Sequence, residues 1–229
     1  MPRLEDVFRS QQEALASNLS AARVRELLVY IRDFAALVTD ALEGLDFTEP
    51  EKQTVLRVLA VDSLSSLFVA CRAGLWGNVP EAAVLTRTAL ETLTIMACVV
   101  EEGAFRAFNF EMRSRLRHYS YDQCHARLGD RGARLNVLHG RLSDVGGHTS
   151  RNRLKFAEFK IDGVSYDRLG FAPDGDFSET ALLLIPDSLQ YLAAILHASF
   201  AQDRRVFPWD QRQTELNARY AHFIQARDR

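Results

Sequence analysis

The chain has few of the residues and motifs that mark common enzyme and metal-binding classes. Its 229 residues include three cysteines, an odd number without CxxC spacing, which indicates neither a disulfide framework nor a zinc site. A glycine-rich phosphate loop with a following lysine, a GxSxG turn and an HExxH pair are all missing. We therefore expect no metal and no cofactor, and we interpret Cys71 and Cys98 as reduced residues of an apolar core.

The sequence also has no apolar run that predicts export or membrane insertion. Its first residues, MPRLEDVFRSQQ, lack the apolar centre of a signal peptide. The most apolar stretch, Ala89 to Val100, is short for a bilayer and is interrupted by Glu91 and two threonines. We expect a soluble, cytoplasmic protein without membrane contact.

Helical periodicity dominates what is present. From Leu27 to Leu42, apolar residues recur at the i, i+3, i+4, i+7 spacing of one buried helix face. Because connections between helical patterns are short, neighbouring helices should be antiparallel. The sequence predicts an all-α fold, an antiparallel helical bundle of about six to eight helices. Their N-terminal cap signatures are Thr48 with Glu51, Asn78 with Glu81, and Asp187 with Gln190.

The helical pattern breaks between residues 140 and 178, where six of the twelve glycines lie. We interpret the chain as a single helical domain, 1–229, with an irregular glycine-rich insertion at about 140–178. Inside the insertion, the turn Asp162-Gly163 predicts a small β-hairpin at 158–167. The expected register pairs Ile161 with Val164 and Phe159 with Tyr166.

Charge is low overall but unevenly distributed. The net charge is −2, yet residues 104–155, named the basic segment here, carry eleven Arg and Lys against four acids, together with four of the six histidines. This asymmetry attracts anions, including the phosphates of nucleic acid. Arginines that gather on one open face would favour RNA binding. Arginines paired with acids of other helices would favour a structural role.

Two charged residues interrupt the otherwise apolar pattern of residues 82–100. Arg87 and Glu91 stand at i, i+4, and Thr94 continues their stripe. An unpaired buried charge is costly, so both side chains need partners. One interpretation is a structural ion pair. The other is a polar site in which Arg87 and Glu91 meet side chains from the irregular insertion.

His148 is a candidate acid or base because it follows two glycines, where solvent or a ligand can approach the imidazole. Its reference pKa, about 6.5, suits proton transfer at neutral pH. A capping or surface histidine is the alternative.

Two segments carry a resemblance to known proteins. The stretch CRAGLWGNVPEAAVLTRTALET, followed by RLSDVGGHTS, resembles a group of uncharacterised bacterial helical proteins that are similar to the HEPN superfamily. Matching members of that superfamily are metal-independent ribonucleases of toxin and antiviral systems. Their signature is an arginine, four to six residues, then a histidine, often at a homodimer interface. The resemblance covers roughly residues 50 to 200.

The resemblance implies specific roles. The signature spacing occurs at Arg113 and His118, Arg134 and His139, and Arg141 and His148. Position relative to the resembling segments favours Arg141 and His148 as the catalytic pair, with the histidine transferring a proton and the arginine stabilising the phosphate. The expected RNA contacts are Arg113, Arg115, Arg117, Tyr119 and Tyr121. Core packing is the alternative for the two tyrosines.

Three functions are open from the sequence. The first is a non-catalytic, HEPN-like interaction or dimerisation domain that forms a homo-oligomer. The second is a ribonuclease or RNA-binding protein of a toxin or phage-defence system. The third is a small-ligand-binding regulator that uses the polar site around Arg87, Glu91 and His148.

Overall fold

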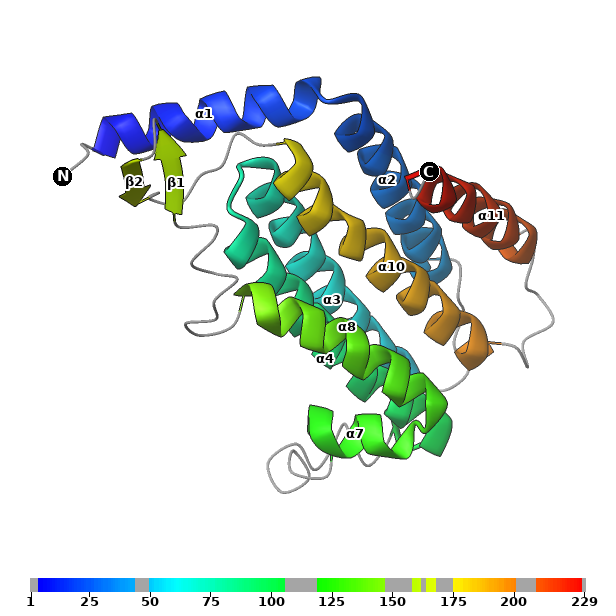
Figure 1. The fold of residues 1–229 in the computed structure, drawn as a ribbon. Coiled ribbons are helices and arrows are strands. Elements are labelled where there is room, and N and C mark those ends of the chain that lie inside the picture. The colour runs from blue at the N-terminus through cyan, green and yellow to red at the C-terminus, as the bar shows by residue number, and fades with distance from the viewer. Residues whose placement is uncertain are drawn as a thin grey trace.

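The computed structural model describes residues 4–43, 50–105, 119–146, 158–161, 164–167, 175–200 and 209–227. These residues form eight helices and one two-stranded sheet, so the predicted helical class is confirmed. Figure 1 shows their arrangement. In chain order the elements are α1 (Leu4–Ser20), α2 (Ala22–Glu43), α3 (Pro50–Leu75), α4 (Val79–Glu102), α7 (Tyr121–Arg127), α8 (Asp130–Gly146), β1 (Glu158–Ile161), β2 (Val164–Asp167), α10 (Gly175–Phe200) and α11 (Trp209–Arg227).

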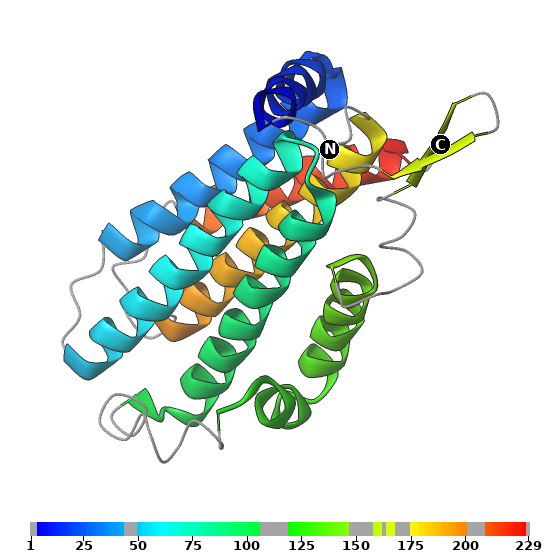
Figure 2. The same cartoon turned by 90° about the vertical axis from the view of Figure 1, so that its left-hand side faces the viewer.

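Four long helices enclose the core. Helix α10 packs against α2, α3 and α4, and α3 packs along α4 (Figure 1). Fully buried Phe34, Leu56, Leu93 and Leu189 bring one large side chain from each of these helices into the core. Helix α11 lies against α2, and α8 lies on the side of α4 away from α3 (Figure 2). The short α7 contacts both α4 and α8.

Two glycines end the central helices through backbone geometry. Gly77 and Gly103 have φ of 76° and 61°, the left-handed region that side chains disfavour. After α3, the Asn78 amide donates to Ala73 O at 2.8 Å, and the Gly77 amide donates to Gly74 O at 3.0 Å. This pattern satisfies helix-end carbonyls and turns the chain sharply into α4.

The side-chain hydrogen bond expected from the Asn78 cap is not formed. Helix α4 begins at Val79, but the Asn78 side chain makes no capping hydrogen bond. Pro80 stands in the first turn instead, where a missing N–H costs nothing because that amide has no helical partner. The cap expected at Thr48 lies outside the described residues.

Helix α10 begins earlier than the sequence predicts. It runs from Gly175 and contains Pro186, whereas the predicted start was Asp187. A proline inside a helix costs about 3 kcal/mol. Fully buried Leu182 and Ile185 precede it and Leu189 follows it, so core packing on both sides offsets the local cost.

Helices extend into the predicted insertion from both ends, because α8 continues to Gly146 and α10 begins at Gly175. Within the insertion, β1 and β2 pair antiparallel. The hairpin has the register expected from the Asp162-Gly163 turn, with Ile161 opposite Val164 and Phe159 opposite Tyr166. Residues 106–118 lie outside the described part of the chain, and α7 begins after them, at Tyr121.

Three helices in the described part of the chain are long and apolar enough to cross a membrane, judged by length and composition: Pro50–Leu75, Val79–Glu102 and Ala181–Ser199. The expectations of a cytoplasmic location and of no membrane contact are therefore wrong. They rested partly on the charge of Glu91 as evidence against a membrane span. Each of the three helices nevertheless contains an eighteen-residue stretch with at most two charged residues. Of that stretch, 61% is buried in α10 but only 44% in α3, so α3 has the least covered apolar surface.

The close approach of α7 and α8 depends on Gly132. A Cβ atom there would lie 1.8 Å from the carbonyl oxygen of His125.

We predict that Gly132→Ala lowers the free energy of unfolding by at least about 2 kcal/mol, because the backbone of α7 or α8 must move to make room for the methyl group. Gly140 is the matched control on the same helix, since nothing lies within 4 Å of its Cβ position. Gly140→Ala should be neutral or stabilising by about 0.5–1 kcal/mol. Urea unfolding of both variants measures this, and equal stability would contradict the packing.

Candidate functional site

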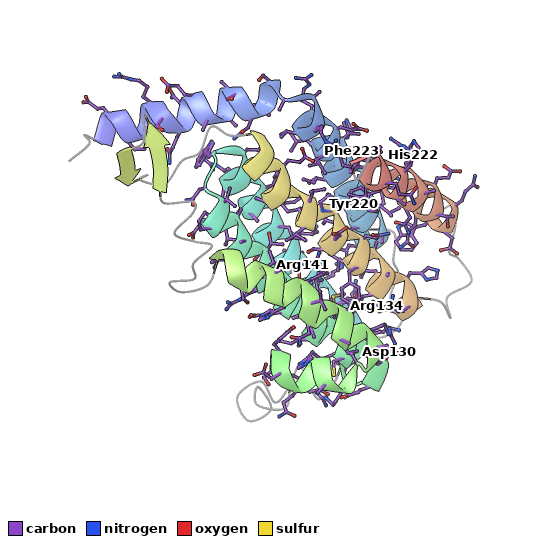
Figure 3. The ribbon with its side chains drawn as sticks, viewed as in Figure 1. Asp130, Arg134, Arg141, Tyr220, His222 and Phe223 are labelled. Carbon is purple, nitrogen blue, oxygen red and sulfur yellow. The ribbon has the colours of Figure 1, made fainter. Side chains whose placement is uncertain are left out.

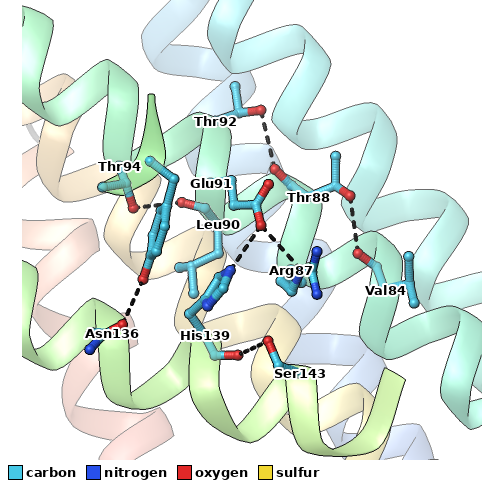
Figure 4. Close-up of polar contacts among 11 residues, drawn as sticks. Val84, Arg87, Thr88, Leu90, Glu91, Thr92, Thr94, Asn136, His139 and Ser143 are labelled. Atoms are coloured by element: carbon cyan, nitrogen blue, oxygen red, sulfur yellow. Dashed lines mark hydrogen bonds and ion pairs between the residues drawn. The ribbon is translucent and has the colours of Figure 1, made fainter. Parts of the chain in front are cut away.

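The polar site is centred on one carboxylate oxygen of α4. Glu91 Oε1 accepts from Arg87 Nε at 3.1 Å and contacts His139 Nε2 of α8 at 2.8 Å (Figure 4). The side chains of Arg87, Glu91 and His139 are 36%, 33% and 20% exposed. The pair predicted from sequence is therefore half-buried, and its partner comes from α8 rather than from the irregular insertion.

A stack of three rings adjoins this carboxylate. Tyr121 of α7 stacks on His139 with ring centroids 4.2 Å apart and on His125 with centroids 5.3 Å apart. Its hydroxyl donates to Asn136 Oδ1 at 3.3 Å. Burial raises the pKa of Tyr121, and the Glu91 and Asp122 carboxylates add to the shift. The stack joins α7 to α8 beside the Glu91 site.

A second polar cluster lies at the C-terminal end of α4. Glu102 Oε2 accepts from the Tyr119 hydroxyl at 2.9 Å, and Glu102 Oε1 pairs with Arg127 Nη1 at 2.8 Å. The Arg127 guanidinium also lies over the Tyr119 ring, 5.1 Å from its centroid. Burial and the Glu102 carboxylate raise the pKa of Tyr119 to about 12. Next to this cluster, Glu101 pairs with Arg131 of α8.

Two of the four described arginines of the basic segment form ion pairs with another helix. Arg127 and Arg131 pair with acids of α4. Arg141 lies on α8, where its charge interacts with Asp187 of α10; Figure 3 labels Arg134 and Arg141 along α8. Pairing with acids of other helices is the arrangement expected for a structural role.

The sequence predictions for this region have different outcomes. Arg87 and Glu91 lie together, and Tyr119 is only 4% exposed, which leaves its ring no face for a stacked base. Arg141 is exposed. The predicted residues that lie outside the described part of the chain are His148, Arg113, Arg115 and Arg117.

His139 is the functional side chain that sequence reasoning missed. The sequence indicated His139 only as the histidine of one Arg-to-His signature pair, with Arg134. Five positions along a helix turn the side chains about 140° apart, so the two residues face different sides. His139 reaches α4, whereas Arg134 is exposed. His139 could be identified only from the packing of α8 against α4, and a single sequence carries no information on that contact.

Neither a metal centre nor an anion site is evident from the described residues. They include no group of three or more His, Cys, Asp or Glu side chains placed to hold a metal ion. A cleft of about 200 Å³ between α2 and α11 is lined by Arg212 and Arg219. Both arginines have carboxylate partners, Asp40 at 2.7 Å and Asp33 at 4.0 Å, so the cleft has no excess of positive charge.

The two tyrosines expected to contact RNA differ in their structural roles. We predict that Tyr119→Phe lowers the free energy of unfolding by about 1–2 kcal/mol, because it removes the hydrogen bond that the buried tyrosine donates to the charged Glu102 Oε2. Tyr121→Phe is the control, since its hydroxyl makes a longer, exposed hydrogen bond, and its effect should stay within about 0.5 kcal/mol. Thermal or urea unfolding measures both, and a larger loss for Tyr121→Phe would contradict this assignment.

No protein-family model, no curated protein and no solved structure matches this chain. The resemblance to the HEPN superfamily therefore stays a prediction that rests on the two short segments quoted above.

Proposed function

We propose that this protein is a non-catalytic interaction domain that pairs with a second copy through the outer face of α3. One observation carries the proposal. Val58, Val61, Phe68 and Val69 all lie on α3 with 61%, 55%, 50% and 53% of their surface exposed. Isolated exposed apolar residues are ordinary, but four large ones on one helix face are typical of an interaction site.

The spacing of this face is that of a helix–helix interface. Exposed residues 58, 61, 65, 68 and 72 follow the alternating three- and four-residue steps of a heptad. We name these five residues the α3 seam: Val58, Val61, Ser65, Phe68 and Arg72. A seam of this kind favours a second helix lying along α3.

The opposite face of α3 is already occupied. Leu56, Leu64 and Leu67 are buried in the core cluster with α4 and α10. A helix that is apolar all round is normally buried all round. Pairing along the α3 seam would cover the remaining apolar side.

Charge and size favour a second copy in antiparallel orientation. In the register that sets Phe68 against Ser65 of the second copy, a large side chain meets a small one. The same register brings Arg72 beside Val61 and Asp62 of the second copy, which adds two symmetric ion pairs. Asp62 and Arg72 are both exposed, and the seam thus carries its own complementary charges. The homodimers implied by the HEPN resemblance are in keeping with this pairing.

A bilayer is the other candidate for the same face, since α3 has the length and composition of a membrane span. Asp62 argues for a protein partner. It lies next to Val61 of the seam and accepts a hydrogen bond from Thr92 at 3.3 Å, and a carboxylate is costly inside hydrocarbon. The ribonuclease alternative has less support, because Arg127 and Arg131 of the basic segment pair with acids of α4. The ligand-binding alternative has less support, because Glu91 already holds Arg87 and His139 as partners.

A charge placed on the α3 seam should separate the copies. We predict that the purified full chain sediments as a dimer and that Val61→Asp sediments as a monomer, because two carboxylates would be desolvated at the interface. Val137→Asp is the matched control, since Val137 of α8 is 57% exposed but lies off the seam. That variant should stay dimeric. A monomeric wild type overturns the proposal, and so does vesicle binding that Val61→Asp abolishes, which would assign the face to lipid.

Engineered cysteines test the orientation. Residues 61 and 72 lie about 16 Å apart along one helix, too far for a disulfide within a chain. In the antiparallel register they face each other across the interface. We predict that the double variant Val61→Cys, Arg72→Cys forms a covalent dimer on mild oxidation and that neither single variant does. A parallel pairing would instead link both single variants, which a non-reducing gel distinguishes.

A further inference from the structure

Two of the three cysteines meet where α7 contacts α4. Cys98 of α4 and Cys124 of α7 are 1% and 0% exposed, and they are close enough that each thiol shifts the pKa of the other. They come from segments that are 26 residues apart in the sequence, so the contact is tertiary. Cys71, the third cysteine, is also buried, at 9% exposed.

The two sulfurs lie at opposite ends of one ion pair. Cys98 Sγ donates to Glu102 Oε1 at 3.4 Å, and Arg127 Nη2 donates to Cys124 Sγ at 3.6 Å. Glu102 and Arg127 themselves are 2.8 Å apart. A carboxylate is therefore placed to accept the proton of one thiol, while a guanidinium is placed to stabilise the thiolate of the other.

We propose that Cys98 and Cys124 form a dithiol site that closes into an intramolecular disulfide when a peroxide oxidises it. This site is independent of the α3 seam. Closure would add a covalent bond to the contact between α4 and α7 and fix the position of α7.

The reaction balances in two steps. The Cys124 thiolate attacks one peroxide oxygen, the O–O bond breaks, and the departing hydroxide takes up a proton to leave as water, which gives a sulfenic acid. Cys98 sulfur then attacks Cys124 sulfur, the S–O bond breaks, and water leaves with the proton that Glu102 accepts from Cys98. In sum, two thiols and one hydrogen peroxide give one disulfide and two waters.

Arg127 makes Cys124 the attacking sulfur. Burial and the Glu102 carboxylate raise the pKa of the Cys124 thiol, but the Arg127 guanidinium and the neighbouring Cys98 thiol act in the opposite direction. Because both sulfurs are buried, peroxide reaches them only when the seven-residue α7 opens from α4. The rate of oxidation should therefore follow this local opening.

The test compares all three cysteines of the full chain. Wild-type protein is treated with hydrogen peroxide, its remaining thiols are alkylated under denaturing conditions, and its peptides are analysed by mass spectrometry. We expect a Cys98–Cys124 disulfide within one chain while Cys71 remains a free thiol, although Cys71 is the most exposed of the three. The oxidised chain should melt about 5 °C higher than the reduced one, and dithiothreitol should reverse the shift.

Variants identify the attacking sulfur. In Cys98→Ser the sulfenic acid at Cys124 has no partner and should be trapped by dimedone, whereas Cys124→Ser should give no such adduct at Cys98. Oxidation of Cys71 before the pair overturns the proposal, as does a chain that retains all three thiols at peroxide concentrations that oxidise a free cysteine peptide. The wild-type measurement decides the matter even when a variant fails to fold.

Discussion

The acidic edge of α4 holds the α7–α8 pair onto the rest of the protein. Glu91 contacts His139, Glu101 pairs with Arg131, and Glu102 pairs with Arg127. Glu91 and Glu101 contact two separate points of α8, which fixes both its position and its direction along α4, and Glu102 holds α7. Buried Leu135 and Leu142 supply the apolar contact beneath them. An arrangement that combines apolar packing with directional ion pairs specifies one docking geometry, because a shifted helix would leave several charges without partners.

This anchoring changes the meaning of the basic segment. A local excess of positive charge is usually evidence for an anionic partner, because exposed cations create an attractive field. Here the compensating acids come from α4, which lies outside the segment in sequence but next to it in space. The excess of positive charge in the basic segment is therefore partly cancelled in the folded protein, because acids of α4 lie next to its arginines. For the described residues, the outer face of α3 stands out more clearly than any basic patch.

The composition of α3 is compatible with two structural roles, a membrane span and a helix packed between the core and a partner. Its apolar residues surround the helix, which satisfies the length and composition of a membrane span. The same property is expected of a helix that packs into a core on one side and against a partner on the other. Burial separates these cases: the core face of α3 contains Leu56 and Leu67, whereas the opposite face carries Val58, Val61 and Phe68 with polar Asp62 among them.

Local features of the fold could be predicted from the sequence, but tertiary ones could not. The i, i+4 contact of Arg87 with Glu91 and the pairing of β1 with β2 depend on neighbours along the chain, and both agree with the expected arrangement. The docking of His139 on Glu91 depends on how α8 lies against α4, which local spacing does not contain. The helix start predicted at Asp187 was wrong for a related reason. Core packing on both sides of Pro186 outweighs the local helix-breaking preference of proline, so α10 continues through it.

Hydrogen exchange tests most directly whether the acidic edge of α4 anchors α7 and α8. A variant that combines Glu91→Gln, Glu101→Gln and Glu102→Gln keeps the shape of α4 and removes its three charges. The account predicts that amide protection falls in α7 and α8 by about tenfold or more, while protection in α2 and α10 stays unchanged. Unchanged protection throughout α7 and α8 would contradict it, because apolar packing alone would then hold the pair in place.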